Sequence, residues 1–499
     1  MKWMPFIAPL FTVSISFAAV QSDSTDILFD DSAVHEYTLT FYASDWKTQL
    51  ETNYTNDAGY IPAKFSDGKI TIDSVGVCYK GNSSYNAAGT SPKKPFKIKF
   101  NEFISGQKYY GIKILNFSNN YGDPTFLREK IAYDIAAKYM HSPRSTFATI
   151  TIESELIGLY TQIEQIDKQF LGRYFTDDSL NLFKASDAGA SLTYSGTDPS
   201  LYASQIELKT NEETNDWSGM IAFLNYINNS DSETFCSTYT NYMDPDNIAP
   251  FLAFIMTLSH FDSYVGSGRN FYLYQTNSDG YMNFLPWDLN LAFGGYSNGW
   301  DVYNQSAIST SNISDRPLFN QLMKCQNFQY KYLSYIKNMI NTYASTDSIQ
   351  KSIDQYVNTI QTFVEADPNK FYSLSDFSTN LTSKLRTASG SIPGLIEFST
   401  TRNAFLLKEL ESILPEDYEA LRVSSLSSFR VSIYNGQIIL SNLSSNKRIQ
   451  VEFFKTNGER LAVIQTSQFM IPIPVLPKGM ILIRIQTQQN TRILKYNNL

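Results

Sequence analysis

Three polar residues stand out in the segment 260–294, which is otherwise rich in apolar and aromatic residues. Asp262 follows an apolar helical stretch, Asn270 opens a predicted strand, and Asp288 lies between two apolar residues after a hairpin signal. A carboxylate among apolar residues is costly to bury unless it is paired or coordinates a cation. The segment therefore predicts a cation site with a second acid nearby. A helix-end Asp and an ordinary turn Asp are the alternative.

A glycine- and serine-rich loop followed by lysines forms a second candidate. The predicted hairpin tip carries Lys80, Gly81 and Ser83. Lys97 and Lys99 then alternate with apolar residues along the next strand. Backbone N–H groups at such a tip can approach phosphates, and lysines can neutralise phosphate charge. A solvated sheet face beside an ordinary polar turn is the alternative.

A third candidate combines the segment 123–129 (DPTFLRE) with the strand that ends at Glu164. Strand alternation places Tyr160, Gln162 and Glu164 on one face. In protein kinases a glutamate orients the lysine that binds phosphate, and a base Asp, a metal-binding Asn and a metal-binding Asp follow in that order. Asp262, Asn270 and Asp288 occur in the same order. Glu164 is then a candidate for the orienting glutamate, with an ordinary solvated glutamate as the alternative.

The elements that must position these residues are predicted from periodicity. The first part, from about residue 30 to 170, is mostly strand, with one helix that begins at Asp123 and Pro124. The next part is mainly helical, with two short strands on either side of a turn at 277–280. Helices are predicted at 217–264, 317–343, 348–362 and 378–414. The pattern is that of an α+β protein.

Composition changes after Pro415, where a serine-rich stretch is followed by short strands separated by Gly-containing turns. This pattern predicts a separate small β-sandwich at 425–499. The preceding domain is placed at 30–415.

Charge and cysteine content exclude several classes of protein. The chain of 499 residues has a net charge of −8 and no basic stripe, which argues against a nucleic-acid partner. The three His residues are scattered, so a zinc site is not expected. The three Cys residues form no CxxC, and one disulfide with one spare thiol is possible.

The N-terminus has the pattern of a secretory signal peptide. Lys2 precedes a nearly uncharged apolar run, and small residues at Ser16 and Ala18 predict cleavage before Ala19. We therefore place a signal peptide at 1–19 and expect no membrane span after cleavage. A single membrane anchor is the alternative, because the run is almost long enough to span a bilayer.

Together the motifs resemble the spore coat protein H (CotH) kinase family over about residues 41–410. The most specific segments read KGNSS, KKPFKIKF, LREKIAYD, GLYTQIEQIDKQFL, NFYLY and PWDLNLAFG. The RPL sequence that starts at Arg316, followed by a helix, also matches. The resemblance implies a divergent protein-kinase-like fold. It also implies transfer of phosphate from ATP, with Mg²⁺ or Mn²⁺, to Ser of a coat or surface protein.

The resemblance also implies roles for individual residues. Asp262 is similar to the family's catalytic Asp, Asp288 to its metal-binding Asp, and Asn270 to the Asn before its YLY strand. Lys97 or Lys99 would face the nucleotide phosphates, with Glu164 nearby, and Lys80 and Lys184 are further nucleotide-binding candidates. The family usually reads PWDLD, whereas this chain has Asn290 in place of the second acid. Asn290 offers a metal an oxygen without a charge.

The C-terminal module resembles sorting domains of type IX secretion substrates. The matching residues are VEFFKTNGE, VLPKGMILIRI and 493–496. This resemblance implies secretion machinery as a partner, and a carbohydrate- or protein-binding sandwich is the alternative.

The expected protein is thus a secreted atypical kinase acting on Ser or Thr of a surface or extracellular protein. The alternative is a weak or inactive kinase fold with a structural or adhesion role at the cell surface.

Overall fold

The structure is a computed structural model. It describes residues 25–175, 177–276, 280–309, 315–387, 390–414, 430–434, 437–441, 449–455, 459–466, 470–486 and 491–498. The proposed signal peptide, the turn residues 277–279 and the serine-rich stretch lie outside these ranges.

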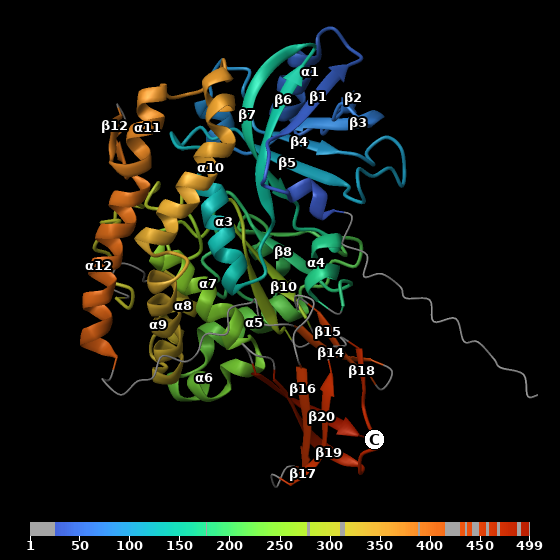
Figure 1. The fold of residues 1–499 in the computed structure, drawn as a ribbon, viewed down its shortest axis with the longest axis vertical. Helices are drawn as coiled ribbons and strands as arrows, with labels where there is room; N and C mark the ends of the chain where they lie inside the picture. The colour runs from blue at the N-terminus through green and yellow to red at the C-terminus, as the bar shows by residue number, and fades with distance from the viewer. Residues whose placement is uncertain are drawn as a thin grey trace, which may run out of the picture.

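The N-terminal part is a closed barrel of seven strands in the order β1-β2-β3-β4-β5-β7-β6 (Figure 1). The strands are β1 (His35–Phe41), β2 (Ile61–Ser66), β3 (Thr71–Tyr79), β4 (Phe96–Lys99), β5 (Ile114–Ser118), β6 (Ser145–Ile152) and β7 (Glu155–Glu164). β1 pairs with β2 in antiparallel and with β6 in parallel orientation, which closes the barrel. The predicted strand-rich part is confirmed, but its closure was not predicted.

Alternation along β4 and β7 separates the barrel interior from the outer face. Phe96 and Ile98 are fully buried inside, and Lys97 between them points outward. On β7, Tyr160 belongs to the barrel core and Leu159 to the core of the helical part. Because side chains alternate along a strand, one face of the barrel wall packs on the barrel core and the other carries Lys97 or packs on the helical part.

Four short helices accompany the barrel: α1 (Trp46–Asn56), α2 (Ser83–Ala87), α3 (Arg128–Tyr139) and α4 (Lys168–Tyr174). α3 begins later than predicted. Asp123 forms a turn in which its carboxylate accepts from the Thr125 amide at 2.9 Å and from the Arg128 amide at 2.8 Å. Phe126, in this turn, has φ of 60°, which no helix permits. Asp123 thus caps the helix from five residues upstream.

The second part contains a four-stranded sheet in the order β11-β10-β8-β9, surrounded by helices. Its strands are β8 (Leu182–Ala185), β9 (Ile206–Leu208), β10 (Phe271–Gln275) and β11 (Met282–Pro286). The helices are α5 (Ser218–Asn229), α6 (Ser232–Thr238), α7 (Pro245–Thr257), α8 (Pro317–Leu322), α9 (Gln326–Asn341), α10 (Thr346–Ala366), α11 (Leu374–Thr382) and α12 (Leu395–Ile413). The predicted β10–β11 hairpin is confirmed by antiparallel pairing. The single helix predicted at 378–414 is wrong: a small hairpin of β12 (Leu385–Thr387) and β13 (Gly390–Ile392) separates α11 from α12.

A buried ion pair joins the barrel to the helical part. Lys93, before β4, donates to Asp367 at the end of α10 at 2.6 Å, and both side chains are fully buried. The Lys93 ammonium also lies 4.6 Å from the ring centre of Phe126. Because a buried charge requires a partner, this contact fixes the two parts against each other.

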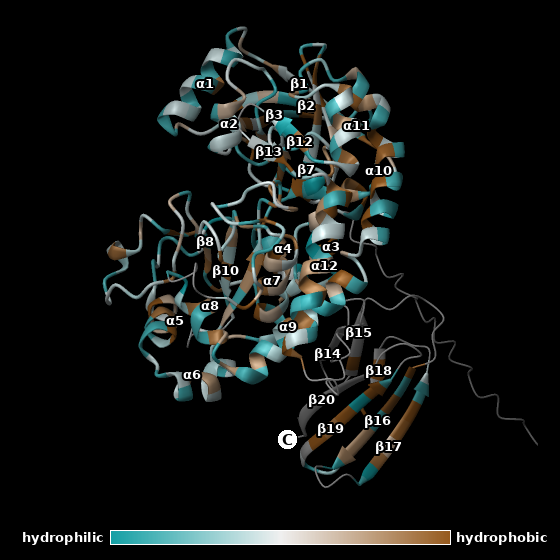
Figure 2. Cartoon of the chain, turned by 90° about the vertical axis from the view of Figure 1, so that its left-hand side faces the viewer, coloured by the Kyte–Doolittle hydropathy of each residue, from teal (hydrophilic) through white to brown (hydrophobic). Residues whose placement is uncertain are grey.

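The C-terminal module has two antiparallel sheets, β14-β15-β18 and β17-β16-β19-β20. Its strands are β14 (Arg430–Tyr434), β15 (Gln437–Ser441), β16 (Ile449–Lys455), β17 (Arg460–Thr466), β18 (Met470–Pro472), β19 (Gly479–Gln486) and β20 (Thr491–Asn498). Ile438 and Ile471 of the first sheet share a core with Val451 and Ile483 of the second. Figure 2 shows the apolar residues along β16 and β19.

Cys236 and Cys325 form a disulfide between α6 and the residue before α9, and Cys78 is a free thiol. Disulfides form and persist in oxidising compartments. Among the residues that the structure describes, no helix has the length and apolar character needed to cross a bilayer.

Candidate active site

A cavity of about 230 Å³ collects most of the residues singled out in the sequence. From the barrel and the residue after β7 it is lined by Lys80, Gly81, Asn82, Ser83, Ser84, Lys97, Asn116 and Gln165. From the second part it is lined by Lys184, Asp187, Lys209, Asp262, Arg269, Asn270, Tyr272, Trp287 and Asp288. The cavity therefore lies between the barrel and the four-stranded sheet.

Asp262 and Asn270 lie in one loop, which runs from the end of α7 at Thr257 to β10, and Asn270 is its last residue. The Asn270 side-chain amide donates to the backbone carbonyl of Asp262 at 2.8 Å and to its Oδ2 at 3.0 Å. Burial raises the pKa of Asp262, while hydrogen bonds from Ser267 and Asn270 and the charge of Arg269 lower it. A carboxylate with a raised pKa is better suited to accept a proton.

Asp288 follows β11 and faces the same cavity. Its backbone amide donates to the Tyr133 hydroxyl on α3 at 3.0 Å. Burial raises the pKa of Asp288 to about 6, and the positive charge of Lys80 opposes this rise. Asp288 and Asn270 both have positive φ, of 50° and 59°. Such strained non-glycine residues cluster at functional sites, and here two of them line one cavity.

Two buried arginines hold the loops that carry these residues. Arg316 donates through Nε to the carbonyl of Tyr264 at 2.5 Å and also donates to the carbonyl of Gly266, both within the Asp262–Asn270 loop. Arg128 donates to the carbonyls of Ala292 and Phe293, in the segment after Asp288. Arg316 and Arg128 belong to the RPL and LRE motifs, so these motifs position the site from outside the cavity.

Lys80 and Lys97 approach the cavity from the barrel. Burial lowers the pKa of Lys80, whereas Asp288 and Glu129 raise it. The Lys80 ammonium lies 5.4 Å from the ring centre of Trp287. Burial, together with the neighbouring Lys80, lowers the pKa of Lys97 to about 8, although Cys78 opposes the shift. The lysines thus carry charge that burial disfavours and that an anion would stabilise.

Glu129 is a site residue that sequence reasoning missed. It lies in the first turn of α3 and is 1% exposed. Burial and the charge of Asp288 raise its pKa well above the ordinary value, and Lys80 opposes this rise. Glu129 therefore lies close enough to Lys80 and Asp288 for their charges to shift its pKa, although it does not line the cavity itself. Its signal was the LRE motif itself, where a glutamate lies next to a buried arginine.

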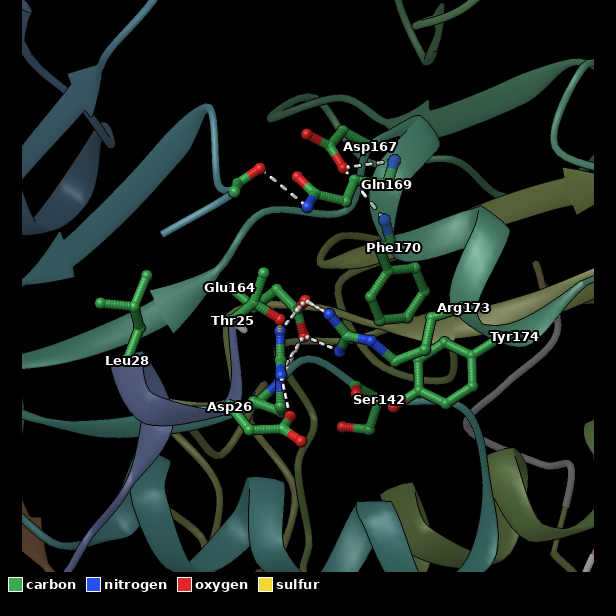
Figure 3. Close-up of polar contacts among 12 residues, drawn as sticks. Thr25, Asp26, Leu28, Ser142, Glu164, Asp167, Gln169, Phe170, Arg173 and Tyr174 are labelled. Atoms are coloured by element: carbon green, nitrogen blue, oxygen red, sulfur yellow. Dashed lines mark hydrogen bonds and ion pairs between the residues drawn. The ribbon is translucent and has the colours of Figure 1, made fainter. Parts of the chain in front are cut away.

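Glu164 is not brought to the cavity. Its carboxylate instead accepts hydrogen bonds from Arg144 and Arg173. Figure 3 shows it facing Arg173, whose Nη2 lies 2.5 Å from Oε1. The alternation on β7 was predicted correctly up to this point. Glu164 is the last residue of β7 and lies next to α4. Its side chain therefore contacts two arginines and does not enter the cavity.

Lys99 and Asn290 also lie apart from this cavity. Lys99 forms an ion pair with Glu102 at 2.6 Å. It lines an adjoining cavity of about 750 Å³ that shares Lys97, Gln165, Lys209 and Tyr272 with the first. Asn290 is half-buried and is not among the residues that line either cavity. The structure thus brings together Lys80, Gly81, Ser83, Lys97, Lys184, Asp262, Asn270 and Asp288 from the predicted set.

A divalent cation fits the donors present. Mg²⁺ is usually held by one or two carboxylates together with water and substrate phosphates. Among the described residues, no three His, Cys, Asp or Glu side chains form a complete metal site. Asp288 and Asn270 line the cavity, and Asp262 Oδ1 is buried without a hydrogen bond. These oxygens suit a cation that arrives with a phosphate-bearing ligand.

Comparison with known proteins agrees with this geometry. The family model described as CotH kinase protein matches residues 77–406, which include every cavity-lining residue named above. The inner spore coat protein H of Bacillus subtilis (strain 168) is 22% identical over 352 residues, covering 68% of this chain and 91% of that protein. The matched region contains the barrel strands β4 to β7, the four-stranded sheet and most of the helices. The chain therefore belongs to the CotH kinase protein family.

Proposed function

We propose that this chain is an exported atypical protein kinase that transfers the γ-phosphoryl group of ATP to a Ser or Thr hydroxyl of a surface or extracellular protein. The observation that carries the proposal is the single cavity that contains Asp262, Asn270 and Asp288 opposite Lys80 and Lys97. These are the acids, amide and cations that phosphoryl transfer requires.

The arrangement of the chain supports a divergent kinase-like fold. A strand-rich part and a helical part border one cavity, and the segment after β7 connects them. Protein kinases carry an H-R-D-x-x-x-x-N catalytic loop. Here His260-Phe261-Asp262 precedes Asn270, with a longer spacing. His260 is fully buried, and burial lowers its pKa to about 3, so it is a neutral structural residue.

The charges of the cavity support a nucleotide triphosphate as donor. Five cationic and three carboxylate side chains line it, in a chain with net charge −8. A magnesium-bound ATP carries a net negative charge that this excess of cations can neutralise. The first cavity is too small for a whole nucleotide, and the adjoining one, which Ile114 and Leu182 help to line, offers room for the base.

Each residue then has a defined task. Asp262 orients the acceptor hydroxyl and takes its proton as the hydroxyl oxygen bonds to the γ-phosphorus and the bond to ADP breaks. Lys80 and Lys97 hold the phosphate oxygens, and Glu129 orients Lys80. Asp288 and Asn270 would hold the Mg²⁺ or Mn²⁺ ion, which neutralises charge on the phosphates when bound.

Export and sorting complete the proposal. The signal peptide predicted at 1–19 and the disulfide suit an oxidising compartment. The relative named as a spore coat protein supports a surface location. The C-terminal module at 425–499 is proposed as a sorting domain that engages secretion machinery.

Thermal unfolding with ATP and Mg²⁺ or Mn²⁺ tests nucleotide binding. Ligand at 100-fold its dissociation constant stabilises a protein by about 2.7 kcal/mol. A γ-labelled ATP assay, with the chain itself and a mixture of Ser- and Thr-rich proteins as acceptors, tests transfer. Asp288→Asn is the control. An unchanged melting temperature with every nucleotide and metal would refute the proposal.

A surface protein with an inactive kinase fold is the second candidate, favoured by Asn290 in place of an acid. Because Asn290 does not line the cavity, this substitution weighs less than the family pattern suggested. Nucleotide binding without transfer to any acceptor would favour this second candidate.

A further inference from the structure

Glu164 is one of the most heavily hydrogen-bonded carboxylates in the described part of the chain, yet the proposed chemistry does not use it. Its side chain is 4% exposed. Arg144 donates to it through Nε at 3.2 Å and Nη2 at 2.8 Å. Arg173 donates through Nη1 at 2.9 Å and Nη2 at 2.5 Å. Two bidentate guanidinium groups therefore share one buried carboxylate, which is a strong and geometrically specific arrangement.

Two of these residues, Glu164 and Arg144, belong to the barrel, and Arg173 belongs to α4, in the segment that connects the barrel to the helical part. Glu164 ends β7 of the barrel, Arg144 precedes β6, and Arg173 lies in the last turn of α4. Between Glu164 and α4 lie only residues 165–167. The carboxylate thus holds the far end of α4 against the barrel, as Figure 3 shows for Glu164 and Arg173.

The segment next to this contact, residues 165–169, also forms a wall of the nucleotide cleft, by which we mean the two adjoining cavities together. Residues 165–169 line the larger cavity, and Gln165 lines both cavities. The first turn of α4 is tethered as well: Asp167 accepts from the amides of Gln169 and Phe170, and Gln169 Nε2 donates to the Gly111 carbonyl at 2.9 Å. A change in the position of α4 would therefore change the width of the cleft.

Residues 25–31, which we call the N-terminal strap, contact Arg144 as well. Arg144 donates to Thr25 Oγ1 at 2.8 Å and forms an ion pair with Asp26. Leu28 is buried in the barrel core, and its carbonyl accepts from Gln162 Nε2 at 2.6 Å. The strap thus fixes the orientation of Arg144, and Arg144 in turn holds Glu164.

We propose that Glu164 is a positioning residue which, with Arg144 and Arg173, latches α4 to the barrel and thereby sets the width of the nucleotide cleft, and that the N-terminal strap completes this latch. The expected effect of the latch on nucleotide affinity rests on the proposed function. Its effect on the position of α4 does not depend on that proposal. Removal of one member leaves a buried charge with too few partners, so α4 is released rather than repacked.

The test compares Glu164→Gln and Arg173→Met with the parent chain. Hydrogen–deuterium exchange without ligand should be faster in amides 165–174 of both variants, and the affinity for Mg-ATP, measured by calorimetry, should fall by about tenfold, because small displacements in a site have effects of this order or larger. Arg173→Lys retains the charge and should recover part of both effects. Asp26→Asn should act in the same direction but more weakly, because Asp26 is 63% exposed.

The chain contains a matched control. Glu452 in β16 is also a buried glutamate between two arginines, with Arg460 at 3.2 Å and Arg484 at 2.7 Å, but it belongs to the C-terminal module. Glu452→Gln should leave the exchange of 165–174 and the nucleotide affinity unchanged. This control separates loss of the latch from a general loss of stability.

Two results would overturn the latch. One is exchange in 165–174 that is unchanged in Glu164→Gln and Arg173→Met. The other is faster exchange with Mg-ATP affinity equal to that of the parent. If the parent chain itself binds no nucleotide, the proposed function fails, and the exchange data alone decide whether Glu164 holds α4.

Discussion

Asn270 donates its side-chain amide to both the backbone carbonyl and Oδ2 of Asp262, at 2.8 Å and 3.0 Å. The proposed base and a proposed metal ligand are therefore joined before any substrate arrives. Because the bond uses the Asn270 nitrogen, the amide oxygen of the same side chain is left for a cation. Substitutions at the two positions should not be additive, since each changes the other's orientation.

Asp262→Asn should abolish phosphotransfer while largely sparing nucleotide binding. The amide has nearly the same shape as the carboxylate, but it cannot accept the proton of the acceptor hydroxyl. Transfer should fall by at least about 10²-fold, a typical contribution of a general base. The assay is γ-labelled ATP turnover beside calorimetry. A variant that retains full transfer would exclude Asp262 as the base.

Asp288→Asn should weaken Mg²⁺-dependent nucleotide binding as well as transfer, because the charge that would hold the metal is lost. Without ligand, the same variant should be more stable at pH 7 than the parent. The pKa of Asp288 is raised to about 6 in the fold, so its ionised form destabilises the folded state above that pH. This gain should be about 1–2 kcal/mol and should vanish below about pH 4. Urea unfolding at both pH values measures it.

Asn290→Asp tests the departure from the family pattern directly. Asn290 does not line the cavity, so a restored acid should change Mg²⁺ affinity by less than about twofold. Calorimetry with Mg-ATP decides. A marked increase in affinity would show that this side chain reaches the metal in the nucleotide complex.

The sequence predicted the cavity residues best where local pattern determines direction. Alternation on β4 placed Lys97 on the outer face, and the helix–loop–strand pattern placed Asp262 and Asn270 in one loop, although the helix ends earlier than predicted, at Thr257. The motif order then predicted that Asp288 shares their cavity. In each case the relevant contact depends on a short stretch of chain and on its period.

Local pattern could not decide whether Glu129 or Glu164 lies near the cavity lysine. Glu129 and Glu164 both lie in matching motifs, and both are buried. Which of them lies close enough to Lys80 to affect its pKa depends on how the barrel closes, through the parallel pairing of β1 with β6, and on the late start of α3 at Arg128. These are contacts between distant segments, which local periodicity does not encode.

Lys97 should make nucleotide binding sensitive to alkaline pH. Its pKa is lowered to about 8, so the charge that attracts phosphate is lost as the pH rises from 7 to 9. Affinity for Mg-ATP should fall over this range in the parent, and Lys97→Arg should remove most of the dependence, because arginine remains protonated.

Without nucleotide, the folding stability of the protein should respond to pH in the opposite direction: it should rise over the pH range in which nucleotide affinity falls. The folded pKa of Lys97 lies below its unfolded value, so the buried charge destabilises the fold at neutral pH, and stability is recovered between about pH 8 and 10.5. Lys97→Met should therefore stabilise the apo chain at pH 7 by about 1–2 kcal/mol. A destabilised variant would show that Lys97 already has an anionic partner in the free protein.

Lys93→Met should destabilise the chain by about 3 kcal/mol, because it leaves Asp367 buried without its cation. Lys94→Met, at the adjacent lysine of the same motif, should have a smaller effect, because Lys94 donates to uncharged groups, the carbonyls of Tyr85 and Gly89. Gly158→Ala should also destabilise, since a Cβ there would lie 2.6 Å from both Asp367 carboxylate oxygens. Denaturant unfolding measures all three. Equal effects for Lys93 and Lys94 would contradict the assignment of Lys93 as the link between the two parts.

A chain that ends after Leu414 should fold and bind nucleotide as the full chain does. The sequence placed the end of the larger domain at residue 415, and the packing of Ile413 and Leu414 against the main core supports a cut at the end of α12. The C-terminal strands have a core cluster of their own, so their removal exposes little of the larger core. Thermal unfolding and Mg-ATP calorimetry on the two chains provide the comparison. If the shortened chain is soluble and keeps its melting temperature but loses nucleotide affinity, the β module contributes to the cleft, and the division of the protein into a kinase-like domain and an independent sorting module is wrong.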